Sequence, residues 1–306
     1  MIISITNNGY IQKTPKNEFG VQKCGGKGIY KSFYSSGIKT IIEASENDTL
    51  LLFTTMGQCY KLNVHDIPSL DIEENGISLN EMFDVNDTFC SILSIRDFLV
   101  SNEADDYLVI IMTKKGKMSK QKLTDYKGIL DGTYAVSLDE GDGFASVIIA
   151  KENDFAFNCS IDGIGKTFST DSVRTTSLKS RSKGVLCSYL RYPESSLVDI
   201  DVCGDSNIGY LLISSMGYLI RTRNIYYGDR KCSGGSLMNL KENDHVVFNS
   251  FADEDDDILI VTNKGYTIRL NIGYLKEVNR GGRGSLCIKL SEGDKISACC
   301  KIRGMI

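Results

Sequence analysis

The chain has 306 residues, 42% of them hydrophobic, with only three prolines and no tryptophan. This composition supplies a large core and argues against a disordered or linker-rich chain. The longest apolar runs, such as residues 108–112, are too short to span a bilayer, and no basic flank precedes Ile2 and Ile3. We therefore expect a cytoplasmic protein without a signal peptide and without a membrane partner.

Cysteine and histidine usage gives little support to metal chemistry. The ten cysteines form no C-x-x-C pair, only Cys299 and Cys300 are adjacent, and the chain has only two histidines. Zinc sites need paired ligands at short spacing, whereas most of these cysteines sit in apolar runs typical of buried strands. We expect free structural thiols in a reducing compartment and no metal site.

One short pattern recurs six times along the chain: an apolar run, a turn ending in glycine, and a basic or polar strand. The copies read ISITNNGYIQK (3–13), LLFTTMGQCYK (51–61), VIIMTKKGKMSK (109–120), FAFNCSIDGIGK (155–166), LLISSMGYLIR (211–221) and LIVTNKGYTIR (259–269). Asn8-Gly9 and Asp162-Gly163 are strong hairpin signals, and the flanking runs are β-branched and aromatic. Each copy is therefore predicted to begin with a β-hairpin.

A second pattern closes most copies: an apolar residue, then Gly-Asp or Asn-Asp, then another apolar run. It is clearest in SLDEGDGFASVII (137–149), NLKENDHVVFNSF (239–251) and KLSEGDKISACCKI (289–302). About four strands in a repeat near 50 residues is typical of a propeller blade, and no segment sustains a helical period. We predict a single all-β domain over 1–306, a ring of six four-stranded blades at approximately 1–45, 46–103, 104–150, 151–203, 204–252 and 253–306.

The net charge of −4 conceals a segregation of charge by position in the repeat. The stretches 7–31, 113–127, 163–184, 217–231 and 264–283 hold 25 of the 35 Lys and Arg residues but only five of the 39 Asp and Glu residues. One repeated position is one repeated place in a ring, so these cations should form a basic stripe along one edge, suited to a polyanion. The alternative is that the charged loops are merely solvated.

The second repeat breaks this register. Residues 57–76 hold Lys61 against four acidic residues, Asp66, Asp71, Glu73 and Glu74. We expect this blade to contact a polyanion weakly or not at all.

The run VQKCGGKGIY (21–30) has three glycines around a lysine, which is the chemistry of an anion site. A nucleotide loop of the Walker type would need Ser or Thr after Lys27 and a helix behind it. Here Gly28 follows Lys27, no helical pattern follows, and the last repeat holds a close echo, NRGGRG (279–284). The run is better read as one of several related basic loops.

Together, the 50-residue repeats, the T-x-x-G-Y hairpins, the E-G-D turns and the QKCGGKG run resemble the C-terminal domain of the bacterial DNA gyrase A subunit over the whole chain. That family's box is usually Q-R-R-G-G-K-G. This chain keeps Gln22, Gly25, Gly26, Lys27 and Gly28, and it has Lys23 and Cys24 where the two arginines are usual. The A subunit of topoisomerase IV has a related, more degenerate domain, and the sequence leaves that alternative open.

The resemblance implies a six-bladed β-pinwheel, a propeller-like disc whose neighbouring blades exchange strands. It implies sequence-independent binding, bending and wrapping of duplex DNA around a basic outer edge, so that gyrase introduces negative supercoils. It also implies a non-catalytic, excised domain of an ATP-dependent type IIA topoisomerase, with no cofactor of its own and with ATP and Mg used elsewhere. The implied partners, within an A2B2 enzyme, are the gyrase B subunit and the catalytic core of its own A subunit.

We predict that Lys23 and Lys27 are phosphate cations and that Gly25, Gly26 and Gly28 donate bare amides to a phosphate; the alternative is that the glycines only pack a tight loop between blades. Gln22 contacts the DNA backbone or fixes the loop, and Cys24 completes the box. Further DNA contacts are expected from cations of the other loops and strands, namely Lys13, Lys31, Lys120, Lys122, Arg181, Lys183, Arg221, Arg230, Lys231, Arg280 and Arg283.

Two rival classes of propeller are disfavoured by the sequence. A WD40-like or kelch-like interaction hub would carry that family's own signatures, and this chain has neither Trp nor a Gly-His to Trp-Asp pattern. A propeller enzyme such as a sialidase would need repeated Asp boxes, whereas SIDGIGKTF (160–168) resembles one only once and out of register.

Overall fold

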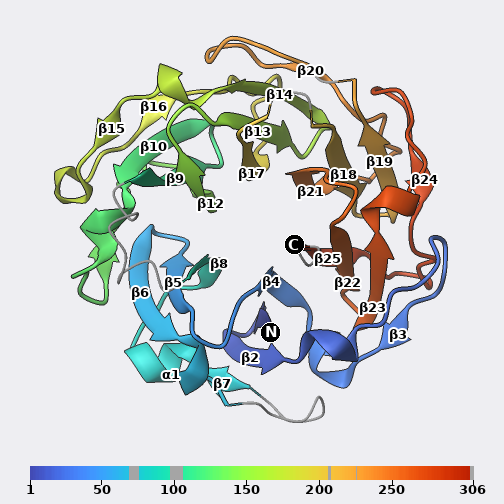
Figure 1. The fold of residues 1–306 in the computed structure, drawn as a ribbon, viewed down its shortest axis with the longest axis horizontal. Helices are drawn as coiled ribbons and strands as arrows, with labels where there is room; N and C mark the ends of the chain where they lie inside the picture. The colour runs from blue at the N-terminus through green and yellow to red at the C-terminus, as the bar shows by residue number, and fades with distance from the viewer. Residues whose placement is uncertain (69–75, 97–105, 206–207, 225, 304–306) are drawn as a thin grey trace.

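The computed structural model describes residues 1–68, 76–96, 106–205, 208–224 and 226–303. Six small β-sheets are arranged around a central axis like the blades of a propeller (Figure 1). The predicted all-β, six-bladed β-pinwheel is confirmed. Blades are numbered 1 to 6 in chain order by the hairpin that each contains.

Each blade has an innermost strand, a central hairpin and a short outer strand. The innermost strands are β4 (Ile38–Glu43), β8 (Phe89–Ile95), β12 (Phe144–Lys151), β17 (Leu197–Cys203), β21 (Val246–Phe251) and β25 (Ile296–Ile302). The second strands are β1 (Ile2–Thr6), β5 (Thr49–Thr54), β9 (Tyr107–Thr113), β13 (Phe155–Ser160), β18 (Tyr210–Ser214) and β22 (Asp257–Thr262). The third strands are β2 (Tyr10–Thr14), β6 (Gln58–Asn63), β10 (Lys117–Lys122), β14 (Ile164–Ser169), β19 (Tyr218–Thr222) and β23 (Tyr266–Asn271).

The outer strand of every blade is donated by another repeat. In blade order these strands are β7 (Ile77–Ser78), β11 (Thr133–Tyr134), β15 (Thr175–Thr176) with β16 (Val185–Leu186), β20 (Gly235–Ser236), β24 (Ser285–Leu286) and β3 (Ile29–Tyr30). Blades 1 to 5 receive their outer strand from the following repeat. Blade 6 receives β3 from the first repeat, with Tyr30 opposite Tyr266, so the ring is closed by the two ends of the domain.

The central strands are apolar on both faces because each blade packs between two neighbours. Residues 108–112 of β9 are all buried, and buried side chains of adjacent blades form shared clusters, such as Ile3 and Ile5 of blade 1 with Leu50 and Phe89 of blade 2. Strands covered on both faces read as continuous hydrophobic runs. This explains why the hairpins were visible in the sequence.

Helix is scarce, as predicted from the absence of a helical period. The α-helix α1 (Leu79–Phe83) is capped by Ser78, whose hydroxyl accepts a bond from Glu81 N at 3.3 Å. Short 3-10 turns follow several strands: η1 (Lys16–Glu18), η2 (Ser32–Ser36), η3 (Val64–Asp66), η6 (Leu123–Tyr126), η7 (Thr170–Ser172), η8 (Leu178–Ser180) and η9 (Ile272–Tyr274). Within the described ranges, no helix is long and apolar enough to cross a membrane.

All ten cysteines lie in described segments and are free thiols, and Cys24 alone among them is exposed. Among the residues that the structure describes, no cluster of three or more His, Cys, Asp or Glu side chains could hold a metal ion.

Candidate nucleic-acid interface

The glycine-lysine run leaves blade 1 and lies along the outer edge of blade 6. Its backbone is pinned there at three points: Gln22 N donates to Arg269 O at 2.8 Å, Gly25 N donates to Cys287 O at 2.8 Å, and Lys289 N donates to Gly26 O at 2.8 Å. The run is therefore a fixed loop on the rim of the disc and not a flexible arm.

The side chains of this loop divide by exposure. Lys23, Cys24 and Lys27 are exposed on the rim. Gln22 is half-buried, and its Nε2 donates to Thr267 O at 3.4 Å, so the structure places Gln22 where it fixes the loop. The Cys24 thiol donates to Leu286 O at 3.3 Å, and partial burial raises its pKa above the usual value.

The glycines of the loop have a packing role in this structure. The amides of Gly25 and Gly26 are already bonded, to Cys287 O at 2.8 Å and to Lys23 O at 3.3 Å, so the expectation of free amides for a phosphate is corrected at both positions. Gly28 has φ +78°, and a Cβ there would lie 2.8 Å from Thr267 O. A side chain at this position would push the outer strand away from the blade.

The echo in the last repeat has the same geometry one blade away. Gly281 N donates to Leu237 O at 2.7 Å, and Asn239 N donates to Gly282 O at 2.8 Å. These bonds match those of Gly25 and Gly26, so Arg283 corresponds to Lys27 and Arg280 to Cys24. Arg283 is exposed, and the half-buried Arg280 guanidinium lies 5.2 Å from the Tyr226 ring centre.

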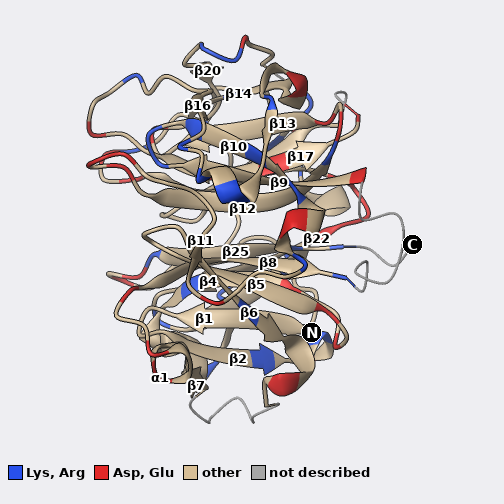
Figure 2. Ribbon diagram, turned by 90° about the vertical axis from the view of Figure 1, so that its left-hand side faces the viewer, with Lys and Arg blue, Asp and Glu red and all other residues tan. Residues whose placement is uncertain are grey.

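Two further loops continue the rim over blades 4 and 3. In the first, Lys231 is exposed and Arg230 is half-buried. In the second, Arg181 and Lys183 are exposed, and the Arg181 guanidinium lies 5.7 Å from the Tyr134 ring centre. Exposed cations therefore occupy related loops on blades 3 to 6, which are consecutive in the ring. Seen edge-on, Lys and Arg lie on the strands and loops around β10, β14 and β16, with Asp and Glu on intervening turns (Figure 2).

Three predicted DNA contacts are placed inside the fold instead. Lys13, Lys120 and Arg221 are 3%, 3% and 5% exposed, and each is paired with a carboxylate, Glu46, Glu152 and Glu254 in that order. These side chains cannot reach a phosphate on the rim without leaving their buried positions and their carboxylate partners, so the expectation is corrected for all three. Their strands looked basic in the sequence because the cation stands four residues after each turn glycine.

These buried cations join one blade to the next. Lys13 Nζ donates to Val64 O at 3.2 Å, and Lys120 Nζ donates to Thr170 O at 3.4 Å. Both acceptors are the first residue of the 3-10 turn after the third strand of the following blade. Arg221 reaches the corresponding turn, with Nη1 at 3.1 Å from Ile272 O and 2.9 Å from Leu275 O. The repeated basic position is thus a clamp between blades.

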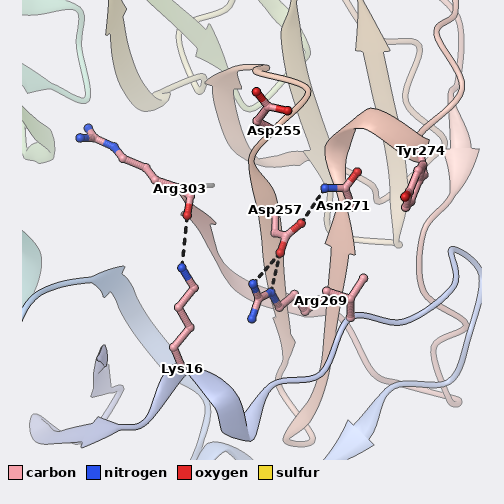
Figure 3. A pocket seen from close by; sticks show the side chains of 8 residues that line it. Lys16, Asp255, Asp257, Arg269, Asn271, Tyr274 and Arg303 are labelled. Atoms are coloured by element: carbon pink, nitrogen blue, oxygen red, sulfur yellow. Dashed lines mark hydrogen bonds and ion pairs between the residues drawn. The ribbon is translucent and has the colours of Figure 1, made fainter. Parts of the chain in front are cut away.

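The same clamp closes the ring at the seam between blades 6 and 1. Arg269 pairs with Asp257 (Figure 3). Its Nη1 also donates to Phe19 O at 3.1 Å, so the last blade holds the first repeat. A pocket of about 350 Å³ lies beside this pair. Lys16 at its edge pairs with Glu43 at 2.7 Å and donates to Arg303 O.

Replacing Arg221 by Met is expected to lower the free energy of unfolding by about 3–5 kcal/mol, because three backbone carbonyls of the next blade lose their buried donor. The midpoint of urea unfolding would measure this loss. Arg223→Met is the matched control, since Arg223 contacts the same Glu254 and Glu277 but its side chain is 62% exposed. We expect a change below about 1 kcal/mol for the control. Equal effects would contradict the clamp.

Two predicted cations lie elsewhere. Lys122 is exposed at the end of β10. Lys31 is half-buried, pairs with Glu18 at 3.3 Å, and has its ammonium 5.7 Å from the Phe19 ring centre. Neither lies on the loop positions that Lys27 and Arg283 share.

The rim loop of the third repeat is less basic than the others, although its stretch 113–127 is rich in lysine. In that loop the exposed Lys127 stands five residues before Gly132, as Lys23 stands before Gly28, but the exposed Asp131 takes the place of Lys27. In the sequence, a rim loop is marked by the glycine that precedes its outer strand, namely Gly28, Gly132, Gly184, Gly234 or Gly284. The hairpin glycine does not mark it. In the second repeat, Asp71, Glu73 and Glu74 lie outside the described residues.

One carboxylate on the rim competes for its cations. Asp139 pairs with Lys117 and, at 2.9 Å, with Lys183; the bonds from Lys117 and Lys183 lower its pKa to about 2. We expect Asp139→Asn to strengthen binding of a duplex about 3-fold to 10-fold and to steepen its salt dependence by about one unit, because Lys183 becomes free for a phosphate. Fluorescence anisotropy across a salt series would measure both.

The control is Glu140→Gln, which makes the same change in charge at an exposed neighbouring position. If the two variants gain equally, net charge alone would account for the effect and the competition at Asp139 would be excluded.

Comparisons with known proteins agree with this architecture. A family model described as the DNA gyrase C-terminal domain, beta-propeller, matches residues 1–29, 48–70 and 256–299. The DNA gyrase A subunit of Staphylococcus epidermidis is 25% identical over 311 residues, covering 99% of this chain and 34% of that protein. The chain thus spans about a third of the length of the curated relatives it matches.

Two solved structures are similar over nearly the whole chain. A DNA gyrase A C-terminal domain aligns with a TM-score of 0.86 at 23% identity, covering 98% of this chain and 99% of that one. A C-terminal domain of DNA topoisomerase IV aligns with a TM-score of 0.72 at 18% identity, covering 99% and 93%. The resemblance stated from the sequence is therefore confirmed: this chain is a β-pinwheel similar in sequence and fold to the C-terminal domain of the DNA gyrase A subunit.

Proposed function

We propose that this domain binds duplex DNA without regard to sequence and bends it along the rim of blades 3 to 6. The observation that carries the proposal is that four consecutive rim loops each present exposed cations: Lys23 and Lys27, Arg283, Lys231, and Arg181 with Lys183. The half-buried Arg280 and Arg230 stand beside Arg283 and Lys231 in their loops. The loop of blade 2 sets the exposed Lys127 against the exposed Asp131, and residues 69–75 before the outer strand of blade 1 lie outside the described residues. The proposed track is therefore the arc of blades 3 to 6.

The physics of such a surface favours a long polyanion. Each phosphate neutralised by Lys or Arg releases condensed counterions, so spaced cations bind a duplex without reading its bases. Bending 20–30 base pairs through a large angle costs on the order of 1–6 kcal/mol. Phosphate contacts spread over several blades can offset that cost, whereas a single basic patch cannot.

In its parent we propose a non-catalytic role in the gyrase A subunit of a type IIA topoisomerase, in the cytoplasm, beside the catalytic core and the B subunit of an A2B2 enzyme. Wrapped DNA there would be presented for strand passage that yields negative supercoils, with ATP and Mg used elsewhere in the enzyme. The second candidate is the topoisomerase IV A subunit, where the domain would steer substrate DNA; the fold similarity to that domain favours it as the alternative.

Titrating linear duplexes of increasing length at several salt concentrations tests the proposal. We expect affinity to rise with length until the basic arc is filled, and then to level off, with a steep fall as salt increases. A single-stranded oligonucleotide of equal phosphate number is the control for charge alone. Tight binding of a ten-base-pair duplex with no gain from longer ones would exclude bending along the rim.

A further inference from the structure

Blade 4 carries a buried lysine where blades 5 and 6 carry an apolar residue. Lys166 stands three residues after the turn glycine of its hairpin, the place that Ile220 and Ile268 occupy in blades 5 and 6. Its side chain is 1% exposed. At the next position, where blades 1, 3, 5 and 6 have the clamp cation, blade 4 has Thr167. The lysine therefore does not belong to the series of clamps.

The ammonium is surrounded by the backbone of one rim loop. Lys166 Nζ lies 2.7 Å from Asp229 O, 2.6 Å from Arg230 O and 2.7 Å from Cys232 O, and a fourth carbonyl, Cys187 O, lies at 2.7 Å. The Cys232 sulfur lies at 3.7 Å and the Phe168 ring centre at 5.1 Å. An ammonium has three N–H donors and no acceptor, which suits a shell made of carbonyl oxygens.

The acceptors show what this lysine replaces. In the loop of blade 6, the amide of Gly25 bonds Cys287 O and the amide of Lys289 bonds Gly26 O. Cys187 O and Cys232 O are the corresponding acceptors on blade 4, and Lys166 Nζ donates to both of them. One side chain thus makes the two connections that two backbone amides make elsewhere on the rim.

The contacts of Lys166 determine where the cations of this loop lie. Because the carbonyls of residues 229, 230 and 232 converge on Nζ, the loop is curled around the ammonium, with Lys231 exposed and Arg230 half-buried at its surface. The loop has Lys231 and Cys232 where the loop of blade 6 has Gly25 and Gly26, so it lacks the glycines that fold the other loop.

We propose that Lys166 is a positioning residue that folds the 229–232 loop and so presents Arg230 and Lys231 on the rim. The role of Arg230 and Lys231 in DNA binding rests on the proposed function. The role of Lys166 in folding the loop is independent of the proposed function.

The first test measures the loop without DNA. In Lys166→Met we expect amide hydrogen exchange across residues 229–235, and trypsin cleavage after Arg230 and Lys231, to become at least about tenfold faster, with the loop at 279–284 unchanged. Lys120→Met is the matched control, because it removes another buried third-strand lysine that contacts no rim loop, and it should leave 229–235 protected. Unchanged exchange at 229–235 in a folded Lys166→Met protein overturns the proposal.

Lys166→Ile covers the case in which Lys166→Met does not fold, because isoleucine is the residue that blades 5 and 6 carry at this position. We expect the same local increase in exchange, and an unchanged loop in the folded variant would again overturn the proposal.

The second test adds DNA. We expect Lys166→Met to weaken duplex binding about 3-fold to 10-fold in the wild-type background and to have no further effect once Arg230 and Lys231 are replaced by Ala. If Lys166→Met lowers the duplex affinity equally in both backgrounds, positioning of Arg230 and Lys231 is not the cause of the loss. If Arg230→Ala with Lys231→Ala leaves binding unchanged, the DNA role of this loop fails, while exchange at 229–235 still decides what Lys166 does.

Discussion

Replacing Lys23 and Lys27 together by Ala is expected to weaken duplex binding about 50-fold at 0.1 M salt and to reduce the slope of log affinity against log salt by about two. Both side chains are exposed on a loop whose backbone is fixed to blade 6, so their loss removes the two proposed phosphate contacts and little stability. Anisotropy titration of a long duplex across a salt series measures both quantities. In a full-length parent, supercoiling should fall while relaxation survives.

The matched control is Lys39→Ala with Lys151→Ala. These lysines are also exposed, but they lie on the innermost strands β4 and β12, away from the rim. We expect a change of no more than about twofold, because only the long-range field is altered. A loss equal to that of the rim pair would show that net charge governs binding, and equal loss of supercoiling and relaxation in the parent would contradict a wrapping role.

Gly284→Ala is expected to lower the free energy of unfolding by about 3 kcal/mol or more. Gly284 has φ +84°, and a Cβ there would lie 2.2 Å from Leu219 O, a backbone atom that can move only if the outer strand β24 leaves blade 5. Urea unfolding measures the global loss, and hydrogen exchange in residues 285–287 reports the detached strand.

Gly293→Ala separates this contact from the cost of the left-handed backbone. Gly293 has φ +70° and no atom within 4 Å of an added Cβ. We expect a loss of only about 1–2 kcal/mol from backbone strain. If the two substitutions cost the same, close approach of the donated strand would not explain why glycine stands before it.

Local chemistry made most of the fold predictable. Turn signals such as Asn8-Gly9 and continuous apolar runs such as 108–112 are short-range features, and six copies of them specify six hairpins. The length of the repeat then favours blades. Which repeat completes a given blade is a long-range property, so the pairing of Ile29–Tyr30 with β23 could not be predicted from local signals.

The candidate interface was predictable only in part. Lys27 and Arg283 stand in similar glycine-rich runs, and both are exposed. Lys13 and Arg221 stand in strands where charge usually means exposure, and their burial depends on Glu46 and Glu254 from other loops. Because each partner carboxylate is distant along the chain, the residues next to the cation do not reveal that it is paired and buried.

The strand that closes the ring also carries the best-marked rim loop, and this couples two equilibria. Lys27 belongs to the first repeat and Arg283 to the last, yet their loops lie on adjacent blades. A phosphate backbone bound by both loops would hold the two ends of the domain together. By thermodynamic linkage, a ligand that binds only the closed ring favours closure by its own binding free energy, and whatever opens the seam must release that ligand first. A mechanical load applied between the termini would then lower the affinity of the domain for such a ligand.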